Sequence, residues 1–387
     1  MPLALRVGLV AGEASGDALG AELIKAIGAL APGAQFFGIA GPKMRAQGCE
    51  TWEPAESLAV MGLFEILFEL PRLMRLRRRV RRAFLAARPD VFVGIDAPEF
   101  NLGLARRLRA KGIATVQYVS PQVWAWRQKR VRGIAAAVDL VLCLLPFEKR
   151  FYDEAGLRAE FVGHPLADQI PLQVDRAAAR AALAIGADVP LIALLPGSRQ
   201  GEVRRLSADF AETARWLAAR RPDIEFVAPL ASAATRQIFA QTFAAQAPGA
   251  RLKLLDGQAQ RALIAADAAL VASGTASLEA ALCKRPMVVV YRLGPLTAWV
   301  LRRLKLVKIR FFAQPNLLAE RRLVGEYFQH DIVPESIGAE LLMWLDDAER
   351  REALADEFLR IHANLRRGAS LGAARAILAL LRLKAGP

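Results

Sequence analysis

The chain lacks the cysteine and histidine clusters that would indicate a disulfide framework or a metal centre. Its 387 residues include only three cysteines and three histidines. All six are widely separated in the sequence: Cys49, Cys143, Cys283, His164, His330 and His362. We therefore expect no disulfide framework, no structural metal and no metal cofactor.

Long apolar runs are also absent, although 54% of the residues are hydrophobic. No run reaches the roughly 18 to 20 apolar residues that a membrane-spanning helix needs. The first residues, MPLALRVGLVAGEASGD, lack the basic start, apolar stretch and small-residue cleavage site of a signal peptide. Their apolar residues fit a first β-strand instead, so we expect a cytoplasmic protein.

The charge is strongly unbalanced, with a formal net charge of +15. Such an excess attracts nucleic acid, anionic membranes or anionic ligands. The sequence has no zinc-finger spacing, aromatic RNA-binding signature or basic heptads, so nucleic acid has no supporting motif. A GC-rich genome that favours arginine would explain part of the excess. A membrane surface or an anionic ligand is therefore the favoured partner.

Short apolar runs that alternate with helical patterns predict parallel α/β sheets. The runs fall into two series, which indicates two doubly wound domains facing each other across a cleft. The first series comprises 5–12, 91–96, 113–120 and 138–146, and the second comprises 191–199, 224–230, 251–257, 268–274 and 286–292.

The predicted organisation has four parts. Residues 1–170 form an N-terminal domain, 171–189 a linker, 190–335 a second domain, and 336–387 a helical tail. The tail packs on the first domain or on a partner subunit, so a homodimer is an open alternative. Ligands of doubly wound sheets bind at the carboxyl ends of the strands, where we expect the chemistry.

Three strand ends in the first half carry candidate residues. GEASGD (12–17) lets a ligand approach the backbone closely, and the helix that starts there can bind an anion. Alternatively, Asp17 caps a helix. Asp96 ends a buried run, as a general base often does, or is an N-cap. VSPQVWAWR (119–127) suits a cleft wall or aromatic domain packing.

In the second half, LPGSRQGEVRRL (195–206) is the clearest local signal. It combines free backbone N–H groups, a positive helix end and the Arg199 guanidinium, an arrangement that suits a diphosphate. It lacks the Lys-Ser/Thr of a P-loop, which argues against NTP hydrolysis. A structural Gly-Ser turn is the alternative.

Two further segments of this half have a similar design. ASGTASLEAAL (272–282) places Glu279 early in a helix, where its carboxylate can accept hydrogen bonds from both hydroxyls of a ribose. Alternatively, the carboxylate only interacts favourably with the helix dipole. FFAQPNLLA (311–319) places Gln314 and Asn316 around a proline, where their amides could read a base or a sugar.

Together these segments resemble the lipid-A-disaccharide synthases, inverting glycosyltransferases of family 19. The matching stretches run in order from residue 11 to about 330: AGEASGDALGAEL, LAVMGLFEIL, FVGIDAPEFN, YVSPQVWAWR, LPFEKRFYDEAG, FVGHPLAD, LLPGSRQGEVRRL, ASGTASLEAAL and PMVVVYRL with QPNLLA. The tail after residue 335 matches only in its helical character.

The resemblance implies a GT-B fold and a specific reaction in lipid A biosynthesis. The sugar of UDP-2,3-diacylglucosamine passes to the 6-hydroxyl of 2,3-diacylglucosamine 1-phosphate (lipid X), giving a β-1,6 disaccharide 1-phosphate and UDP. Asp96 is the predicted base, with Glu13 as the alternative. The sequence has no Asp-x-Asp motif of the kind that holds a metal in other glycosyltransferases.

The resemblance also assigns the remaining candidate residues to two sides of the site. The predicted nucleotide side comprises Gly197, Ser198, Arg199, Glu202, Ser273, Gly274, Thr275, Glu279, Gln314 and Asn316. The predicted acceptor side comprises Glu13, Ser15, Asp17, Gln122 and Trp124.

An apolar run followed by arginines at 60–82 predicts a membrane contact. Glu65 and Glu69 form one narrow polar stripe, so the first helix is more apolar than packing on a core requires; a fully buried helix is the alternative. Pro71 is predicted to end or kink it. The next helix turns Leu73, Leu76, Val80 and Phe84 to the core and its arginines outward.

Acylated substrates reside in a membrane with an anionic surface, so we expect peripheral docking to the cytoplasmic face of the inner membrane. The residues predicted to make this surface are Leu63, Phe64, Leu67, Phe68, Arg75, Arg78 and Arg79.

Two other functions remain open at this point. Another GT-B enzyme of UDP-sugars, such as a UDP-GlcNAc 2-epimerase or the transferase that makes lipid II, would share the nucleotide site but need no acyl-chain surface. A basic, non-catalytic membrane-binding protein with this fold would not depend on Asp96.

Overall fold

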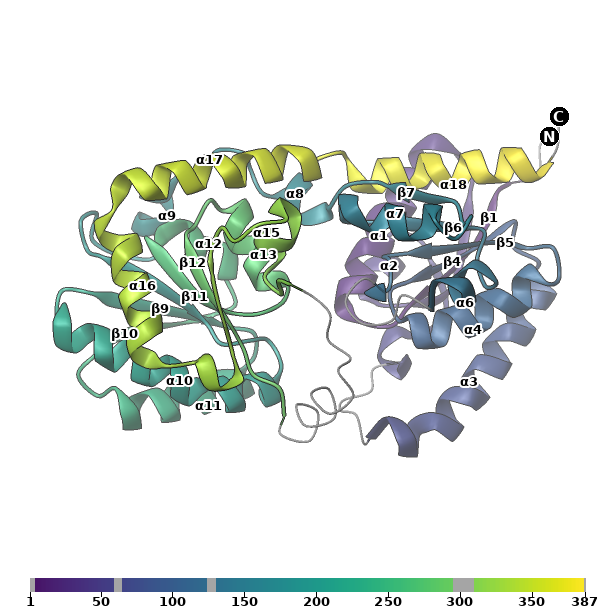
Figure 1. The fold of residues 1–387 in the computed structure, drawn as a ribbon. Coiled ribbons are helices and arrows are strands. Elements are labelled where there is room, and N and C mark those ends of the chain that lie inside the picture. The colour runs from purple at the N-terminus through teal and green to yellow at the C-terminus, as the bar shows by residue number, and fades with distance from the viewer. Residues whose placement is uncertain (1–3, 59–64, 124–129, 295–309, 386–387) are drawn as a thin grey trace. The chain divides into compact units, whose positions relative to one another are not determined.

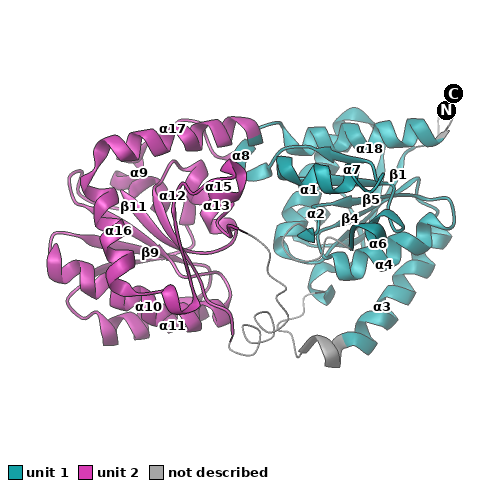
Figure 2. Ribbon diagram, in the orientation of Figure 1, with its two compact units in different colours: residues 1–168, 365–387 teal, residues 169–364 magenta. Residues whose placement is uncertain are grey.

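The computed structural model describes residues 4–58, 65–123, 130–294 and 310–385. The chain divides into two compact units, which are coloured separately in Figure 2. Unit 1 comprises residues 1–168 and 365–387, and unit 2 comprises residues 169–364. Each unit has its own parallel sheet with helices on both faces (Figure 1), so the predicted pair of doubly wound domains is confirmed.

Unit 1 is built on a seven-stranded sheet of order β3-β2-β1-β4-β5-β6-β7. All neighbouring strands are parallel, and most of their residues are buried, which is why they appear as nearly continuous apolar runs. The strands are β1 (Arg6–Ala11), β2 (Gln35–Ala40), β3 (Glu50–Pro54), β4 (Val91–Ile95), β5 (Ala114–Tyr118), β6 (Leu140–Cys143) and β7 (Ala159–Phe161).

Helices cover both faces of this sheet. One apolar cluster joins α1 and α18 to one face, and a second joins α3 and α4 to the other. The helices are α1 (Ala14–Leu30), α2 (Pro42–Ala46), α3 (Glu65–Ala87), α4 (Pro98–Arg109), α6 (Val131–Ala135), α7 (Lys149–Asp153), α8 (Pro165–Gln169) at the unit boundary, and α18 (Ala369–Ala385). Short 3₁₀ turns lie at Ala55–Leu58 and Pro146–Glu148.

Pro71, which was predicted to end or kink its helix, lies inside the continuous helix α3 and therefore does not end it. Further along α3, Leu76, Val80 and Phe84 are buried as predicted. Leu73 is only partly buried. These residues recur every three or four positions, so they turn one face of the helix to the sheet.

Unit 2 is built on a six-stranded parallel sheet of order β10-β9-β8-β11-β12-β13. The strands are β8 (Leu191–Leu195), β9 (Glu225–Leu230), β10 (Arg251–Asp256), β11 (Ala268–Ala272), β12 (Met287–Tyr291) and β13 (Gly325–Phe328). The helices are α9 (Arg176–Ala182), α10 (Gln200–Arg220), α11 (Ala233–Gln246), α12 (Ala259–Ala265), α13 (Thr275–Leu282), α15 (Gln314–Ala319), α16 (Pro334–Asp346) and α17 (Ala348–Leu365), with a 3₁₀ turn at Gln329–Asp331.

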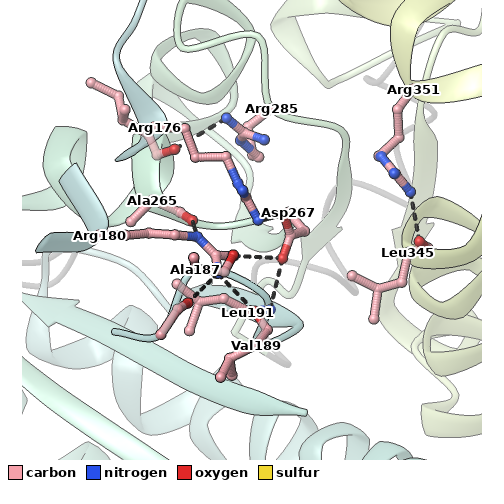
Figure 3. A network of polar contacts seen from close by, with 12 residues as sticks. Arg176, Arg180, Ala187, Val189, Leu191, Ala265, Asp267, Arg285, Leu345 and Arg351 are labelled. Atoms are coloured by element: carbon pink, nitrogen blue, oxygen red, sulfur yellow. Dashed lines mark hydrogen bonds and ion pairs between the residues drawn. The ribbon is translucent and has the colours of Figure 1, made fainter. Parts of the chain in front are cut away.

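Residues 171–189, which we predicted as a linker, are part of unit 2. Helix α9 packs on α12, and the buried Arg180 guanidinium fixes this packing (Figure 3). Arg180 donates to three carbonyls within residues 186–189 and to the Ala265 carbonyl at 2.9 Å. It also pairs with the Asp267 carboxylate at 2.7 Å. The network holds the chain that leads into β8, the strand ending in the Pro-Gly-Ser-Arg loop.

The helical tail is divided between the units. Helices α16 and α17 belong to unit 2, whereas α18 packs on α1 within unit 1. The chain returns to unit 1 at Leu365, where the Asp168 carboxylate accepts hydrogen bonds from the N–H groups of Gly368 (2.8 Å) and Ala369 (2.6 Å). Asp168 thereby satisfies free donors at the start of α18.

Candidate functional site

The first strand end of unit 1 presents an exposed helix start. Glu13 is the N-cap residue of α1, its side chain makes no capping bond, and both Glu13 and Ser15 are exposed. A Cβ built on Gly12 would lie 3.0 Å from the Ala97 Cβ, so the turns after β1 and β4 are adjacent. The sheet thus brings two of the predicted acceptor residues beside the predicted base.

Asp17 has the helix-capping role that the sequence left open as the alternative, and the helix that it caps is α2. It is 3% exposed, and its carboxylate accepts hydrogen bonds from the N–H groups of Gly41 (3.0 Å), Lys43 (2.9 Å) and Met44 (3.0 Å). These N–H groups lie at the start of α2, where a carboxylate is favoured by the free donors and by the helix dipole. The prediction that Asp17 contacts the acceptor is therefore replaced by a capping role.

Asp96 stands in a strained turn directly after β4. Asp96 and Ala97 have φ angles of 51° and 41°, in the left-handed region that residues other than glycine seldom adopt. The Asp96 carbonyl accepts hydrogen bonds from the buried side-chain amides of Asn101 (2.8 Å) and Gln117 (3.1 Å), which hold the turn. Such strain at a strand end is typical of functional sites. The N-cap of α4 is Ala97, so the alternative role of Asp96 as N-cap is wrong.

The turn after β5 forms the neighbouring part of this edge. Val119 has a φ angle of 75°, and the Ser120 hydroxyl lies 2.8 Å from the Tyr152 hydroxyl. Gln122 is exposed, so it is available to a ligand. Trp124, the other residue predicted here, lies outside the described residues.

In unit 2, the loop after β8 has the geometry expected of an anion site. Gly197 has a φ angle of 124°, and a Cβ there would lie 2.8 Å from the Glu202 Cβ, so the turn requires glycine. Ser198 and Arg199 are exposed at the start of the 21-residue helix α10. Glu202 is used locally: its carboxylate accepts a weak hydrogen bond from the Arg199 N–H at 3.4 Å. We expected Glu202 to contact the nucleotide. In the structure its carboxylate helps to shape the loop itself.

The loop after β11 lies beside it, because β8 and β11 are paired. Gly274 and Thr275 are exposed at the start of α13, and the Ser273 hydroxyl donates to the Phe312 carbonyl at 3.3 Å. Glu279 is half-buried, and burial raises the pKa of its carboxyl. Among the described residues its carboxylate has no hydrogen-bond or ion-pair partner. It is therefore an acceptor that a ligand could satisfy.

The segment before α15 separates the roles of the two predicted amides. Asn316 is fully buried, and its side chain bonds only to protein, donating to Val324 O and Glu326 and accepting from two N–H groups. Gln314 instead has a buried side-chain oxygen that finds no hydrogen-bond partner in the part of the chain that the structure describes, while its N–H donates to the Ser277 hydroxyl at 3.2 Å. Gln314 is thus the amide with an acceptor left for a ligand.

Two acidic residues that sequence reasoning missed hold this edge together. Glu326 accepts from the N–H groups of Phe312 (3.2 Å) and Ala313 (2.7 Å) and from the Asn316 amide. Asp209 on α10 forms a two-point ion pair, at 2.7 and 3.0 Å, with Arg292, which directly follows β12. Glu326 lies on a strand that the apolar pattern did not reveal, and Asp209 appeared to be an ordinary polar position of a surface helix.

The described residues contain no group of three or more His, Cys, Asp or Glu side chains that could hold a metal ion. All three cysteines are free and buried. Burial raises the pKa of the Cys49 and Cys283 thiols to about 12, so both are protonated at neutral pH. These thiols are packing residues in each unit.

The described part of α3 presents an exposed surface of mixed character. Leu70 and Met74 are 42% and 43% exposed, unusually high for large apolar side chains. A recess of about 350 Å³ is lined by Arg75, Arg78, Arg79 and Arg82, and Arg79 also pairs with Glu53.

Two other arginines of α3 do not face outward, and some residues predicted for this surface are not described. Arg77 and Arg81 are partly buried, contrary to the prediction that all the arginines face outward. Leu63 and Phe64 lie outside the described residues, and the side chains of Leu67 and Phe68 are not described. No helix in the described ranges has the length and apolar character needed to cross a bilayer.

A comparison with protein families distinguishes between the open functions. Residues 7–379 match the family model described as lipid-A-disaccharide synthetase. The chain belongs to this family. The lipid-A-disaccharide synthase of Serratia proteamaculans is 53% identical over 376 residues, covering 97% of this chain and 98% of the relative. That of Pseudomonas aeruginosa is 52% identical over 377 residues, with the same coverage.

Solved structures with low sequence identity share the fold. The glycotransferase of kitacinnamycin aligns with a TM-score of 0.62 at 18% identity, covering 98% of this chain and 100% of that one. UDP-GlcNAc 2-epimerase from Neisseria meningitidis, solved with UDP-GlcNAc, aligns with a TM-score of 0.60 at 12% identity and the same coverage. The predicted GT-B fold is confirmed, and membership of the synthase family makes the chain a glycosyltransferase of lipid A biosynthesis.

Proposed function

We propose that the chain transfers 2,3-diacylglucosamine from its UDP derivative to the 6-hydroxyl of 2,3-diacylglucosamine 1-phosphate. The products are the β-1,6 disaccharide 1-phosphate and UDP. The observation that carries the proposal is Asp96, a carboxylate in a turn with positive φ angles at the carboxyl end of a parallel strand. The family membership and the exposed anion-binding loop of unit 2 support the proposal.

Asp96 acts as the base in this mechanism. Its carboxylate takes the proton from the acceptor 6-hydroxyl while that oxygen attacks the anomeric carbon of the donor sugar. The new C–O bond forms as the bond from the anomeric carbon to the diphosphate oxygen breaks, and the configuration inverts. Asn101 and Gln117 act through Asp96, because they hold its carbonyl and thereby the turn.

The leaving UDP gains negative charge on its β-phosphate, which the start of α10 can stabilise. The N–H groups near Ser198, the helix dipole and the exposed Arg199 guanidinium would serve this task. Interactions that strengthen as this charge develops accelerate the transfer itself. The loop Ser273–Thr275 on the neighbouring strand adds a second helix start.

The nucleoside would meet two acceptors near these loops that have no hydrogen-bond partner among the described residues, Glu279 and Gln314. The Glu279 carboxylate can accept hydrogen bonds from both ribose hydroxyls, which would offset the cost of its burial. The free side-chain oxygen of Gln314 can accept from the N3–H of uracil. Asn316 holds this segment in place and does not touch the ligand.

Asp96→Asn tests the assignment of the base. The variant should bind UDP like the unaltered protein and lose at least about 100-fold in turnover, since general-base catalysis typically contributes that much or more. Glu13→Gln, the alternative base at the adjacent strand end, is the comparison variant, and it should lose much less turnover than Asp96→Asn. If Asp96→Asn retained turnover while Glu13→Gln lost it, Glu13 would be the base.

We also propose that α3 docks the protein on an anionic membrane. Exposed Leu70 and Met74 beside an arginine recess match the composition of interfacial helices, in which each basic residue adds about 1 kcal/mol near an anionic surface. A Leu70→Ser/Met74→Ser variant should lose co-sedimentation with phosphatidylglycerol vesicles and keep its affinity for UDP. Unchanged sedimentation of a folded variant would refute the docking role of these residues.

A further inference from the structure

Unit 2 exposes three aromatic rings at the carboxyl edge of its sheet, which we call the aromatic trio: Tyr291, Phe312 and Phe328. Their ring centroids lie 6.0 to 6.3 Å apart, within contact distance of one another. Tyr291 is 37% exposed and Phe328 is 36% exposed, and Phe312 is partly buried. A contiguous apolar surface of this kind on a folded protein indicates a binding site more often than isolated exposed side chains do.

The aromatic trio is continuous with the proposed nucleotide site. Tyr291 ends β12 and is paired in register with Phe328 on β13. The backbone of Phe312 is fixed from both sides, because its carbonyl accepts from the Ser273 hydroxyl and its N–H donates to Glu326. The residue that positions one ring is therefore part of the loop at which the diphosphate would bind.

Cationic side chains flank the aromatic trio. Burial is the main cause of the raised pKa of Tyr291; the nearby Glu202 carboxylate raises this pKa further, and the nearby Arg205 and Arg199 guanidinium groups lower it. The edge thus presents an anion-binding helix start beside apolar rings. A ligand that carries a diphosphate and a hydrocarbon chain in one molecule would satisfy both.

The shape of the aromatic trio suits a flexible acyl chain better than the flat ring of a nucleotide base. Its rings are inclined to one another by 39° to 54°, so they form a faceted surface without two parallel faces between which a base could insert. A flexible acyl chain adapts to such a surface and buries apolar area on every ring. Nucleotide recognition already has the separate polar acceptors Glu279 and Gln314.

We propose that the aromatic trio binds an acyl chain of the UDP-sugar donor and makes unit 2 selective for acylated over non-acylated UDP-sugars. This inference rests on the proposed function, which supplies a donor with both parts. Unit 2 then recognises the donor at two places, the diphosphate at the start of α10 and the chain on the aromatic trio.

The test compares the affinities of UDP, UDP-GlcNAc and UDP-2,3-diacylglucosamine for the full chain, with the acylated donor below its aggregation concentration. The variants are Phe328→Ser and Phe312→Ser, and the matched control is Leu359→Ser on α17, whose side chain is 40% exposed. Each trio variant should bind the acylated donor more weakly by a factor of about ten or more, because one ring no longer shields the acyl chain from water. UDP and UDP-GlcNAc should bind as before, and the control should change nothing.

Three results would overturn the inference. Equal losses for UDP and the acylated donor would assign the rings to the base, and unchanged donor affinity in both variants would remove them from the site. An equal donor loss in Leu359→Ser would indicate a general surface effect. If Phe312→Ser failed to fold, as a thermal melt would show, the exposed Phe328 would carry the test alone. The proposed function fails by a different result, namely no affinity of the unaltered chain for UDP.

Discussion

Replacing Asp17 separates a structural carboxylate from a substrate-binding one within the same motif. Its carboxylate accepts three N–H donors at the start of α2, at 3.0, 2.9 and 3.0 Å, and it is almost fully buried. Asp17→Ala leaves these donors without a partner. A lost cap typically costs about 1 kcal/mol and a lost bond to a charged group about 1.5–3 kcal/mol, so we expect a loss of about 2–4 kcal/mol.

Urea unfolding of Asp17→Ala and Asp17→Asn measures this loss directly. Asp17→Asn keeps one acceptor oxygen, so its loss should be smaller, about half as large. In the folded fraction, the KM for the acceptor should stay within about twofold of its value for the unaltered chain in both variants. The reason is that a residue that only caps a helix makes no contact with the substrate.

Glu13→Gln is the matched control for this experiment, because Glu13 lies on the same helix start but is exposed and makes no capping bond. It should unfold at the same urea concentration as the unaltered chain. The reasoning would be refuted by an Asp17→Ala variant of undiminished stability whose KM for the acceptor rises tenfold.

Three further predictions concern residues that support the site. Arg180→Met should lower the free energy of unfolding by about 3–5 kcal/mol, since it leaves the Asp267 carboxylate and several carbonyls short of a donor; urea unfolding measures this, and a loss below 1 kcal/mol would contradict it. His164 accepts a hydrogen bond from the Leu166 N–H, and burial lowers the pKa of its ring to about 4 from 6.5. Between these two pH values the unfolded chain therefore binds more protons than the folded one. The free energy of unfolding should then fall as the pH drops from 6.5 to 4, by at most about 3 kcal/mol. A His164→Asn variant that loses stability in acid to the same extent would show that His164 is not the cause. Glu326→Gln should weaken UDP binding about tenfold by loosening the segment at Phe312, and unchanged affinity in calorimetry would show that the segment does not depend on this carboxylate.

The apolar strands were predictable because burial on both faces leaves a simple signal. β1, β4, β5 and β6 of unit 1 and β8 to β12 of unit 2 coincide with predicted runs, whereas the apolar strand β2 was not predicted. β3 was missed because its residues are only partly buried and include two glutamates and a proline. β7 and β13 are only three and four residues long, too short for a pattern.

The roles of individual polar residues were less predictable, because a motif does not show what each side chain faces. Asp17 and Asn316 belong to segments that resemble the family, yet long-range bonds to Gly41 and Val324 commit both to structure. Gln117 is a polar residue in an apolar strand, a signal that could have been followed to the Asp96 turn. The bonds of Glu326 needed the folded sheet.

The measurement that tests the central claim most directly is UDP release by the full chain with both acylated sugars and with each one alone. We predict UDP release only when UDP-2,3-diacylglucosamine and 2,3-diacylglucosamine 1-phosphate are present together, with one disaccharide formed per UDP. The same experiment on Asp96→Asn should show bound UDP-sugar and almost no release. UDP released from the donor alone at the same rate, or full release by Asp96→Asn, would contradict the account.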